Sequence, residues 1–145
     1  MIYWLTGQPG AGKTTIAKHI LNHLPSGSFM HIDGDDLRDI FDNKDYSEVG
    51  RRKNIERAQD IALFMNNKGF DVIVSLVSPY KDQRDDFKIK NNVVEVFVHT
   101  TEDRGRNQYH VINYEPPTEN FIDVDTTNKT VEDSVIDILK HRNHE

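Results

Sequence analysis

A glycine-rich segment near the start of the chain has the residue types that bind phosphate groups. Residues 7–14 read G-Q-P-G-A-G-K-T, which fits the pattern G-x-x-x-x-G-K-[ST]. Glycines let successive backbone N–H groups turn toward phosphate oxygens, and the helix predicted to follow presents its positive dipole end. We expect Lys13 to reach the β- and γ-phosphates and the Thr14 hydroxyl to ligate Mg²⁺. The residues predicted to bind the triphosphate are Gly7, Gln8, Pro9, Gly10, Ala11, Gly12, Lys13, Thr14 and Thr15.

Two carboxylates flank a glycine after the second apolar segment, in the order Asp33, Gly34, Asp35. Ligands of open α/β sheets bind at the carboxyl ends of strands. Phosphoryl transfer needs a group that orients the acceptor hydroxyl and carboxylates that hold metal-bound water. We therefore predict that Asp35 orients the acceptor and that Asp33 acts with Thr14 at the metal, with Lys13 completing the catalytic set. The alternative is an Asp-Gly turn with solvated aspartates, because such turns are common.

A buried strand predicted over 72–77 strengthens the case for these aspartates. Many proteins with this kind of loop end such a strand with an aspartate that holds Mg²⁺. Here the apolar run contains Ser75 and is followed by Ser78. No other predicted strand offers an obvious replacement. The Asp33 and Asp35 pair must then handle the metal if this is a kinase.

Arg51 and Asn54 lie three residues apart near the start of a long predicted helix, so they share one face. A guanidinium near the positive end of a helix can bind a phosphate or a similar oxyanion through two hydrogen bonds. Arg38, one turn after Asp35, is a third candidate. For any single arginine a solvated surface position is the more common outcome.

Short apolar segments alternate with helical patterns, which predicts an α/β fold with a parallel sheet and helices on both of its faces. The predicted strands are Ile2–Thr6, Phe29–Ile32, Val72–Val77, Val93–Val98 and Phe121–Val124. The first predicted helix starts at Lys13 and stops at Pro25-Ser26-Gly27, and the next two are Asp36–Phe41 and Glu48–Asn67. A fourth helix over Tyr80–Phe87 follows a Ser78 cap and Pro79. A last helix follows a capping box of Thr130 and Asp133. The segment Thr100–Glu119 fits no element.

Length and composition point to one domain over residues 1–145. The chain has 18 basic and 24 acidic residues and a net charge of −6, with no basic block, so a nucleic-acid or anionic-membrane partner is not indicated. It has no cysteine, which rules out disulfides and thiolate chemistry. We find no signal peptide and no apolar stretch of ~20 residues, and we therefore predict a cytoplasmic protein.

The order of these motifs resembles the adenylylsulfate (APS) kinase family, which phosphorylates the ribose 3′-hydroxyl of APS with MgATP. The strings that carry the resemblance are G-Q-P-G-A-G-K-T-T, I-D-G-D-D-L-R, N-K-D-Y-S, the stretch from Arg51 to Arg57, V-S-L-V-S-P-Y, V-E-V-F-V-H-T and Y-E-P-P. The resemblance implies a three-layer α/β/α P-loop fold of the mononucleotide-kinase kind with a five-stranded parallel sheet. It also implies Asp35 as the base, and relatives that are often dimeric.

Residues that bind the acceptor follow from the same resemblance. It places Arg38, Arg51, Asn54, the Val77-Ser78 backbone and Lys81 around the acceptor, with the ring of Tyr46 against its base. Tyr46 stands where the family usually has phenylalanine. A flat aromatic ring supplies stacking area for a nucleobase, although a single tyrosine is more often part of the core.

One departure from the family concerns the lid, the segment 101–113 between H-T and Y-E-P-P. The family has a longer lid with a lysine-rich helix and a second aromatic residue. Here Arg104 and Arg106 are candidates to stabilise the transferring phosphoryl group, and Tyr109 is a candidate replacement aromatic, while the alternative for both arginines is a solvated loop. A short lid excludes water less well, so activity is modest, a partner completes the site, or the acceptor is not APS.

The predicted function is ATP- and Mg²⁺-dependent phosphorylation of APS to 3′-phospho-APS, a step of sulfate activation. The first alternative keeps the chemistry and changes the acceptor to another nucleotide-diphosphoryl compound, such as a cytidine- or uridine-linked sugar or amidate. The second is a nucleotide-binding regulator without catalysis, or a subunit whose partner supplies the lid. The sequence also leaves a homodimer open.

Overall fold

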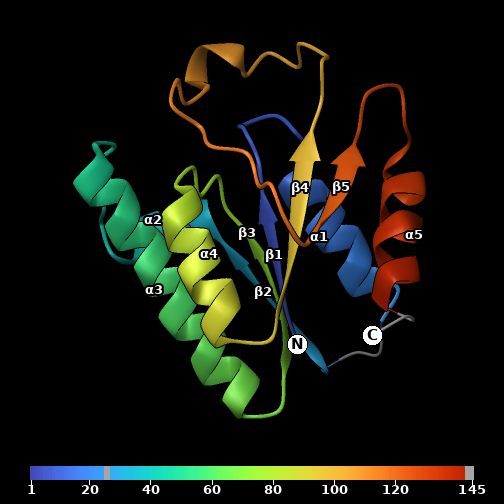
Figure 1. The fold of residues 1–145 in the computed structure, drawn as a ribbon, viewed down its shortest axis with the longest axis horizontal. Coiled ribbons are helices and arrows are strands. Elements are labelled where there is room, and N and C mark those ends of the chain that lie inside the picture. The colour runs from blue at the N-terminus through green and yellow to red at the C-terminus, as the bar shows by residue number, and fades with distance from the viewer. Residues whose placement is uncertain (25–26, 143–145) are drawn as a thin grey trace.

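Five parallel strands form the centre of the computed structural model, which describes residues 1–24 and 27–142 (Figure 1). They lie in the order β2-β3-β1-β4-β5. Their bounds are β1 Ile2–Thr6, β2 Phe29–Asp33, β3 Asp71–Ser75, β4 Val93–His99 and β5 Phe121–Asp125. All four pairings are parallel, so the carboxyl ends of the strands meet at one edge of the sheet.

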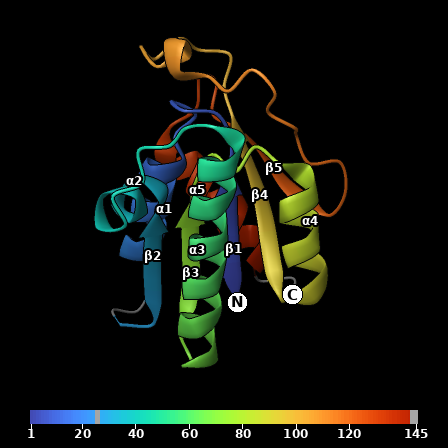
Figure 2. The same ribbon diagram turned by 90° about the vertical axis from the view of Figure 1, so that its left-hand side faces the viewer.

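Helices cover both faces of this sheet and complete a three-layer α/β/α arrangement, as predicted (Figures 1 and 2). Helices α1 (Lys13–Asn22) and α5 (Val131–Arg142) pack on one face. The other face carries α2 (Gly34–Ile40), α3 (Glu48–Asn67) and α4 (Lys81–Lys90).

Strand β1 is buried on both faces because it lies in the middle of the sheet. Side chains alternate along a strand, so Tyr3 and Leu5 join the core under α1 and α5. Ile2 and Trp4 join the core under α3 and α4. The loop that follows β1 is therefore anchored by two separate hydrophobic cores.

Helix α3 has the bounds predicted from its apolar periodicity. Ile55, Ala58 and Ala62 recur at helical spacing and are buried against the sheet. Gly69 follows the helix at φ 99°, and the N–H of Phe70 donates to the carbonyl of Met65, as in a glycine C-cap. The predicted end at Lys68-Gly69 is confirmed. For the predicted end of the first helix, Pro25 and Ser26 lie outside the described residues.

The strand ends differ from the prediction by one or two residues. Strand β3 stops at Ser75 rather than Val77, and its last register partner on β1 is Leu5. Strands β2, β4 and β5 each keep one more residue. Asp33 still pairs with Ser75, and His99 with Asp125, in the parallel register.

The predicted start of α4 at a Ser78 cap is wrong, since the helix begins at Lys81 and runs to Lys90. Ser78 lies at φ 40°, and its hydroxyl accepts a hydrogen bond from the Trp4 indole (2.9 Å) and donates to the carbonyl of Leu76 (3.1 Å). It is therefore not available as a cap. Helix α2 begins at Gly34, earlier than predicted, and ends at Ile40.

The start of α5 agrees better with the sequence. The hydroxyl of Thr130 accepts a hydrogen bond from the N–H of Asp133 (3.1 Å), which is one half of the predicted capping box.

The lid runs over the carboxyl edge of the sheet, above the glycine-rich loop (Figures 1 and 2). Its regular structure is a single 3₁₀ turn, Asn107–Tyr109, in accord with the absence of any predicted element there. In the part of the chain that the structure describes, no helix has the length and apolar character needed to cross a membrane.

Candidate active site

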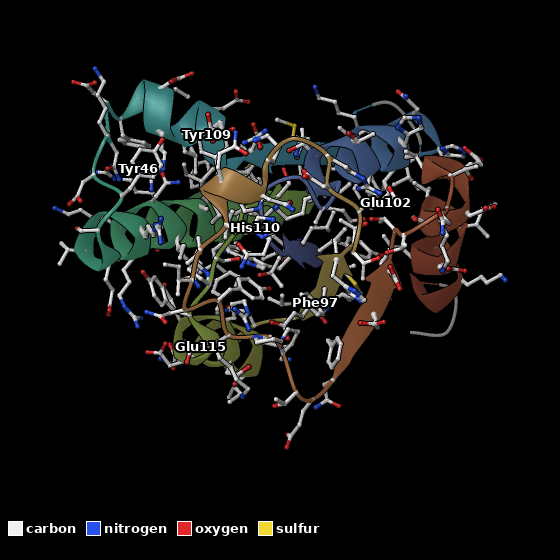
Figure 3. The ribbon with its side chains drawn as sticks, turned by 90° about the horizontal axis from the view of Figure 1, so that it is seen from above. Tyr46, Phe97, Glu102, Tyr109, His110 and Glu115 are labelled. Atoms are coloured by element: carbon white, nitrogen blue, oxygen red, sulfur yellow. The ribbon has the colours of Figure 1, made fainter. Side chains whose placement is uncertain are left out.

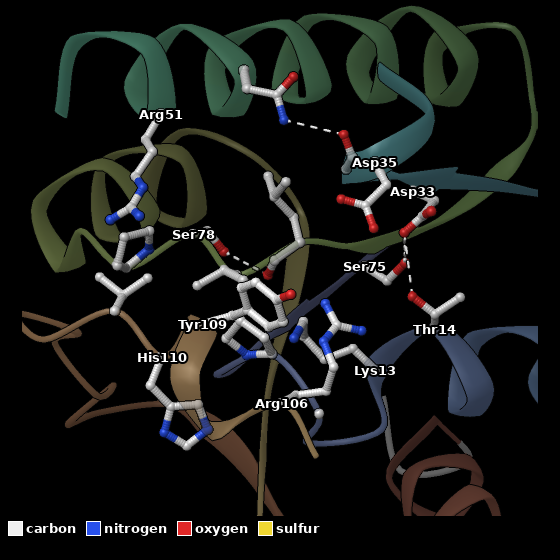
Figure 4. Close-up of a pocket in the computed structure, with 18 of the residues that line it drawn as sticks. Lys13, Thr14, Asp33, Asp35, Arg51, Ser75, Ser78, Arg106, Tyr109 and His110 are labelled. Atoms are coloured by element: carbon white, nitrogen blue, oxygen red, sulfur yellow. Dashed lines mark hydrogen bonds between the residues drawn. The ribbon is translucent and has the colours of Figure 1, made fainter. Parts of the chain in front are cut away.

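A cavity of about 1040 Å³ lies at the carboxyl edge of the sheet. Its walls are the glycine-rich loop, the end of β2, the start of α3, the turn after β3 and the lid (Figure 4). Predicted donor residues and predicted acceptor residues thus line one cavity. Its volume lies at the upper end of the roughly 300–1,000 Å³ that is common for ligand pockets.

The glycine-rich loop wraps the base of this cavity. Pro9, Gly10, Gly12, Lys13, Thr14 and Thr15 line it, whereas Gly7, Gln8 and Ala11 do not. The ammonium group of Lys13 donates to the carbonyl of Gln8 (2.9 Å). Burial lowers the pKa of Lys13 to about 8, although Asp35 and Asp33 act in the opposite direction. Lys13 therefore sits in a position where an added anion would stabilise its charge.

Asp33 lies at the end of β2 and accepts two hydrogen bonds on one oxygen, Oδ1. The Thr14 hydroxyl donates to it over 3.2 Å and the Ser75 hydroxyl over 3.3 Å. Ser75 is in turn 2.7 Å from the ring nitrogen Nε2 of His31, whose pKa is lowered by burial. Thr14 and Asp33 are thus brought together as the sequence predicts, whereas His31 was not among the predicted site residues.

Asp35 is exposed in the first turn of α2 and lines the same cavity, with its carboxylate on the Lys13 side (Figure 4). Gly34 allows this close approach, because a Cβ there would lie 2.2 Å from the Leu76 side chain. The Asn54 amide donates to the Gly34 carbonyl (3.3 Å) and fixes α2 against α3. The other amide atom, Oδ1, is buried without a hydrogen-bond partner in the described chain.

The candidate acceptor residues are arranged in different ways. Arg38 donates to the carbonyls of Asn43 and Asp45, each at 3.1 Å, and its guanidinium lies 4.0 Å from the centre of the Tyr46 ring. One face of Tyr46 is therefore already covered. Arg51 lines the cavity, and its guanidinium forms no hydrogen bond or ion pair with the described residues, so its charge is free.

The turn after β3 supplies backbone groups. The carbonyls of Val77 and Ser78 accept hydrogen bonds from the Thr6 hydroxyl, and Ser78 also accepts one from Arg84 (2.6 Å). Val77 and Ser78 both line the cavity. The structure does not bring Lys81 there, because its ammonium group pairs with Asp85 one turn along α4.

The two lid arginines have different surroundings. Arg104 donates to the P-loop carbonyls of Gly10 (3.2 Å) and Ala11 (3.0 Å), to Thr126, and to Glu102. Its hydrogen-bonding capacity is thereby used within the protein. The Arg106 side chain makes no hydrogen bond with the described residues and lies beside Lys13 in the cavity (Figure 4).

Tyr109 covers the cavity from the lid side. Its ring is 60% exposed and lies 5.3 Å from the guanidinium of Arg106. Seen from above, Tyr109 and Tyr46 lie on the same side of the opening, with His110 next to Tyr109 (Figure 3). His110 and Val111 also line the cavity and were not predicted.

A buried ionic cluster supports the floor of the site. Glu95 of β4 pairs with Arg84 (2.8 Å) and with Lys88 (2.6 Å), and both Glu95 and Arg84 are buried. Arg84 also donates to the carbonyls of Ser78 and Glu115, so it joins the turn after β3 to the strand-like segment after the lid. The hydroxyl of Tyr114 lies 2.7 Å from that of Thr6. The string Y-E-P-P was the sequence signal for this region.

Residues 1–111 match the family model described as adenylylsulphate kinase. The adenylyl-sulfate kinase of Burkholderia ambifaria is 38% identical over 67% of this chain and 57% of its own length. The probable adenylyl-sulfate kinase of Pseudomonas aeruginosa is 31% identical, and that match spans 99% of this chain and 77% of the relative. The chain thus spans little more than half of the Burkholderia relative.

Among solved structures, the Mycobacterium tuberculosis APS kinase CysC in complex with AMPPNP and APS superposes with a TM-score of 0.85. The match covers 98% of this chain and 96% of the other, at 18% identity. It establishes the common fold. Together with the family match over more than half of the sequence, these likenesses show that the chain belongs to the adenylylsulphate kinase family.

Proposed function

We propose that this protein transfers the γ-phosphoryl group of ATP to the 3′-hydroxyl of APS, which yields 3′-phospho-APS and ADP. The observation that carries the proposal is the single cavity in which Lys13, Asp35 and the unpaired Arg51 meet. A cation for the phosphates, a carboxylate for the acceptor hydroxyl and a second cation for an anionic acceptor are what this reaction requires.

On the donor side, the loop amides and Lys13 hold the triphosphate. Lys13 exchanges the Gln8 carbonyl for phosphate oxygens, and this charge pairing offsets the burial that lowers its pKa. Arg106 is the lid cation that neutralises charge on the transferring group, because Arg104 is bound to protein groups.

The donor set near the triphosphate fits Mg²⁺, since Thr14 offers a hydroxyl oxygen and Asp33 a carboxylate whose second oxygen, Oδ2, makes no hydrogen bond with the described residues. These two residues would hold the ion, directly or through water. When bound, the ion supplies charge neutralisation for the phosphates.

On the acceptor side, Asp35 accepts the proton of the 3′-hydroxyl as that oxygen bonds to the γ-phosphorus and the bond from phosphorus to the ADP oxygen breaks. Arg51 and the backbone of Val77 and Ser78 hold the acceptor's anionic groups. Asn54 contributes its unpartnered Oδ1, and the open face of Tyr46 takes the base.

The short lid keeps a second acceptor class open. The match to the family model ends at residue 111, inside the lid, and Arg38 already covers one face of Tyr46. Another nucleotide-diphosphoryl acceptor, such as a cytidine- or uridine-linked compound, would use the same donor half.

The test incubates purified protein with ATP, Mg²⁺ and one acceptor at a time, and detects both ADP and the phosphorylated acceptor by mass spectrometry. We expect product with APS, and none with Lys13→Ala. Turnover of a cytidine- or uridine-linked acceptor with no turnover of APS would replace the proposed acceptor. ATP binding without product from any acceptor would support the regulator instead.

A cytoplasmic location is also part of this proposal, and it rests on the composition of the sequence. A homodimer stays open, because relatives in the family are often dimeric. Size-exclusion chromatography with light scattering measures the oligomeric state.

A further inference from the structure

Four polar side chains form a continuous hydrogen-bonded row from the sheet to helix α1. His31 and Asp33 are two residues apart on β2, so they project from the same face of the sheet. Ser75 is the register partner of Asp33 on the neighbouring strand β3. Thr14, in the first turn of α1, faces them and is joined to Asp33 by a dashed line in Figure 4.

Hydroxyl chemistry determines the direction of the bonds in this row. A carboxylate only accepts, so the Ser75 hydroxyl donates to Oδ1 of Asp33 (3.3 Å), and the Ser75 oxygen then accepts from His31 (2.7 Å) in the tautomer that carries its hydrogen on Nε2. The Thr14 hydroxyl donates to the same Oδ1 (3.2 Å). Both donors therefore converge on one carboxylate oxygen, and Oδ2 makes no hydrogen bond with the described residues.

The row explains how a chain without an aspartate at the end of β3 can still present a fixed carboxylate. Ser75 occupies the end of that strand and has no charge of its own. Its hydroxyl instead links His31 to the carboxylate of Asp33 on the adjacent strand through two hydrogen bonds. A carboxylate held through one oxygen keeps its other oxygen available in a single orientation, which is the usual work of groups behind a metal ligand.

We propose that His31 is a positioning residue for divalent-cation binding: through Ser75 it holds Oδ1 of Asp33 toward Thr14 and leaves Oδ2 for the cation or its water. The inference rests on the proposed function only in that ATP is bound with a divalent cation. It does not depend on the identity of the acceptor.

The test measures nucleotide binding rather than turnover. Binding of a fluorescent ATP analogue is titrated with Mg²⁺, and repeated in excess EDTA, for the wild type, His31→Leu, Ser75→Ala and the double variant. We expect each single variant to need about 10-fold more Mg²⁺ for half-maximal enhancement of binding, because removal of such supporting groups typically weakens metal affinity by 10–100-fold. Affinity in EDTA stays unchanged.

Two further variants sharpen the result. His31→Gln keeps an N–H donor and should recover part of the Mg²⁺ affinity. His99→Leu is the matched control, since His99 also lies on a strand and its Nε2 is 2.9 Å from a polar partner, the Asp123 carboxylate, but outside the cavity. It should leave the Mg²⁺ requirement as in the wild type.

The double variant should be no weaker than the poorer single variant, because both residues act through one row. An unchanged Mg²⁺ requirement in His31→Leu, or an equal loss of affinity in EDTA, overturns the proposal. If circular dichroism shows that His31→Leu does not fold, the Mg²⁺ requirement of Ser75→Ala tests the proposal in its place. Failure to phosphorylate APS with a normal Mg²⁺ response would contradict the proposed function and leave the role of His31 intact.

Discussion

The side-chain amide of Gln8 and the backbone of Val111 form two hydrogen bonds, each of 2.8 Å. Gln8 Nε2 donates to the Val111 carbonyl, and the Val111 N–H donates to Gln8 Oε1. One residue of the glycine-rich loop thereby holds the end of the lid. The carbonyl of the same residue accepts a hydrogen bond from Lys13, so Gln8 contacts both the lid and the Lys13 side chain.

Gln8→Ala should loosen the lid. It removes both hydrogen bonds, each worth about 1 kcal/mol, so amide exchange in peptides covering the lid should become at least ~10-fold faster. Hydrogen–deuterium exchange with mass spectrometry measures this. Gln108→Ala is the control on the same segment, because its side chain makes no hydrogen bond with the described residues. Equal acceleration in both variants would show that Gln8 does not hold the lid.

Asp35→Asn should abolish most turnover while ATP still binds. Loss of a positioned carboxylate that accepts the hydroxyl proton typically lowers kcat by about 10²–10⁴. The ATP affinity, measured by calorimetry, should change far less than kcat. Asp36→Asn, at the next and also exposed position, should behave as wild type because Asp36 does not line the cavity. A parallel loss of ATP binding in Asp35→Asn would contradict the base role.

The two lid arginines should separate catalysis from stability. Arg106→Ala should lower kcat by about 10–100-fold with an unchanged unfolding midpoint, since it removes a free cation. Arg104→Ala should lower the free energy of unfolding by about 2 kcal/mol, because it removes the hydrogen bonds to the carbonyls of Gly10, Ala11 and Thr126. Denaturant unfolding and steady-state kinetics on both variants make the comparison. The reverse pattern would exchange the two roles.

Glu95→Gln should destabilise the protein by about 3 kcal/mol, because removal of one partner leaves the buried Arg84 charge uncompensated. Chemical denaturation measures the change. Asp86→Asn is the matched control: its ion pair with Lys90 is exposed, and its loss should change stability by less than about 0.5 kcal/mol. Similar effects of the two substitutions would mean that burial does not matter at Glu95.

The half-buried Tyr114 should make stability sensitive to alkaline pH. Burial raises the pKa of Tyr114 from 10.0 to about 12, despite the hydrogen bond with Thr6. An acid whose pKa is higher in the folded state than in the unfolded state stabilises the folded protein, and this contribution is complete at any pH below the unfolded-state pKa. For Tyr114 the contribution is therefore lost as the pH rises from 10 to 12, at roughly 1 kcal/mol per pH unit. Tyr114→Phe should show a shallower decline in unfolding free energy over that interval. An identical decline would refute the shift.

Local patterns predicted most of the fold. The bounds of α3 followed from helical spacing and a terminal glycine, and the five strands followed from short apolar runs. The start of α4 was mispredicted because serine is a common helix cap, whereas the Ser78 hydroxyl accepts a hydrogen bond from Trp4, which is far away in the sequence. Sequence spacing carries no information about such a contact.

The candidate site was predicted where a motif is contiguous and missed where it depends on tertiary contacts. Asp33, Asp35 and Lys13 were found from neighbouring letters, and the structure places all three on one cavity. The different surroundings of Arg104 and Arg106 were not predictable, since both are lid arginines. They differ because Arg104 donates hydrogen bonds to carbonyls of the glycine-rich loop and the Arg106 guanidinium does not. His31 resembled an ordinary strand residue.

Gly10 shows that the lid, as well as the phosphate groups, limits which residues fit in the glycine-rich loop. A Cβ at residue 10 would come within 2.9 Å of the Cβ of Arg106, at a backbone φ of 86°. Any side chain there would displace the free lid cation from its place beside Lys13. Substitutions in the loop and in the lid are therefore coupled in this protein: a side chain at residue 10 that leaves room for the nucleotide would still collide with Arg106 of the lid.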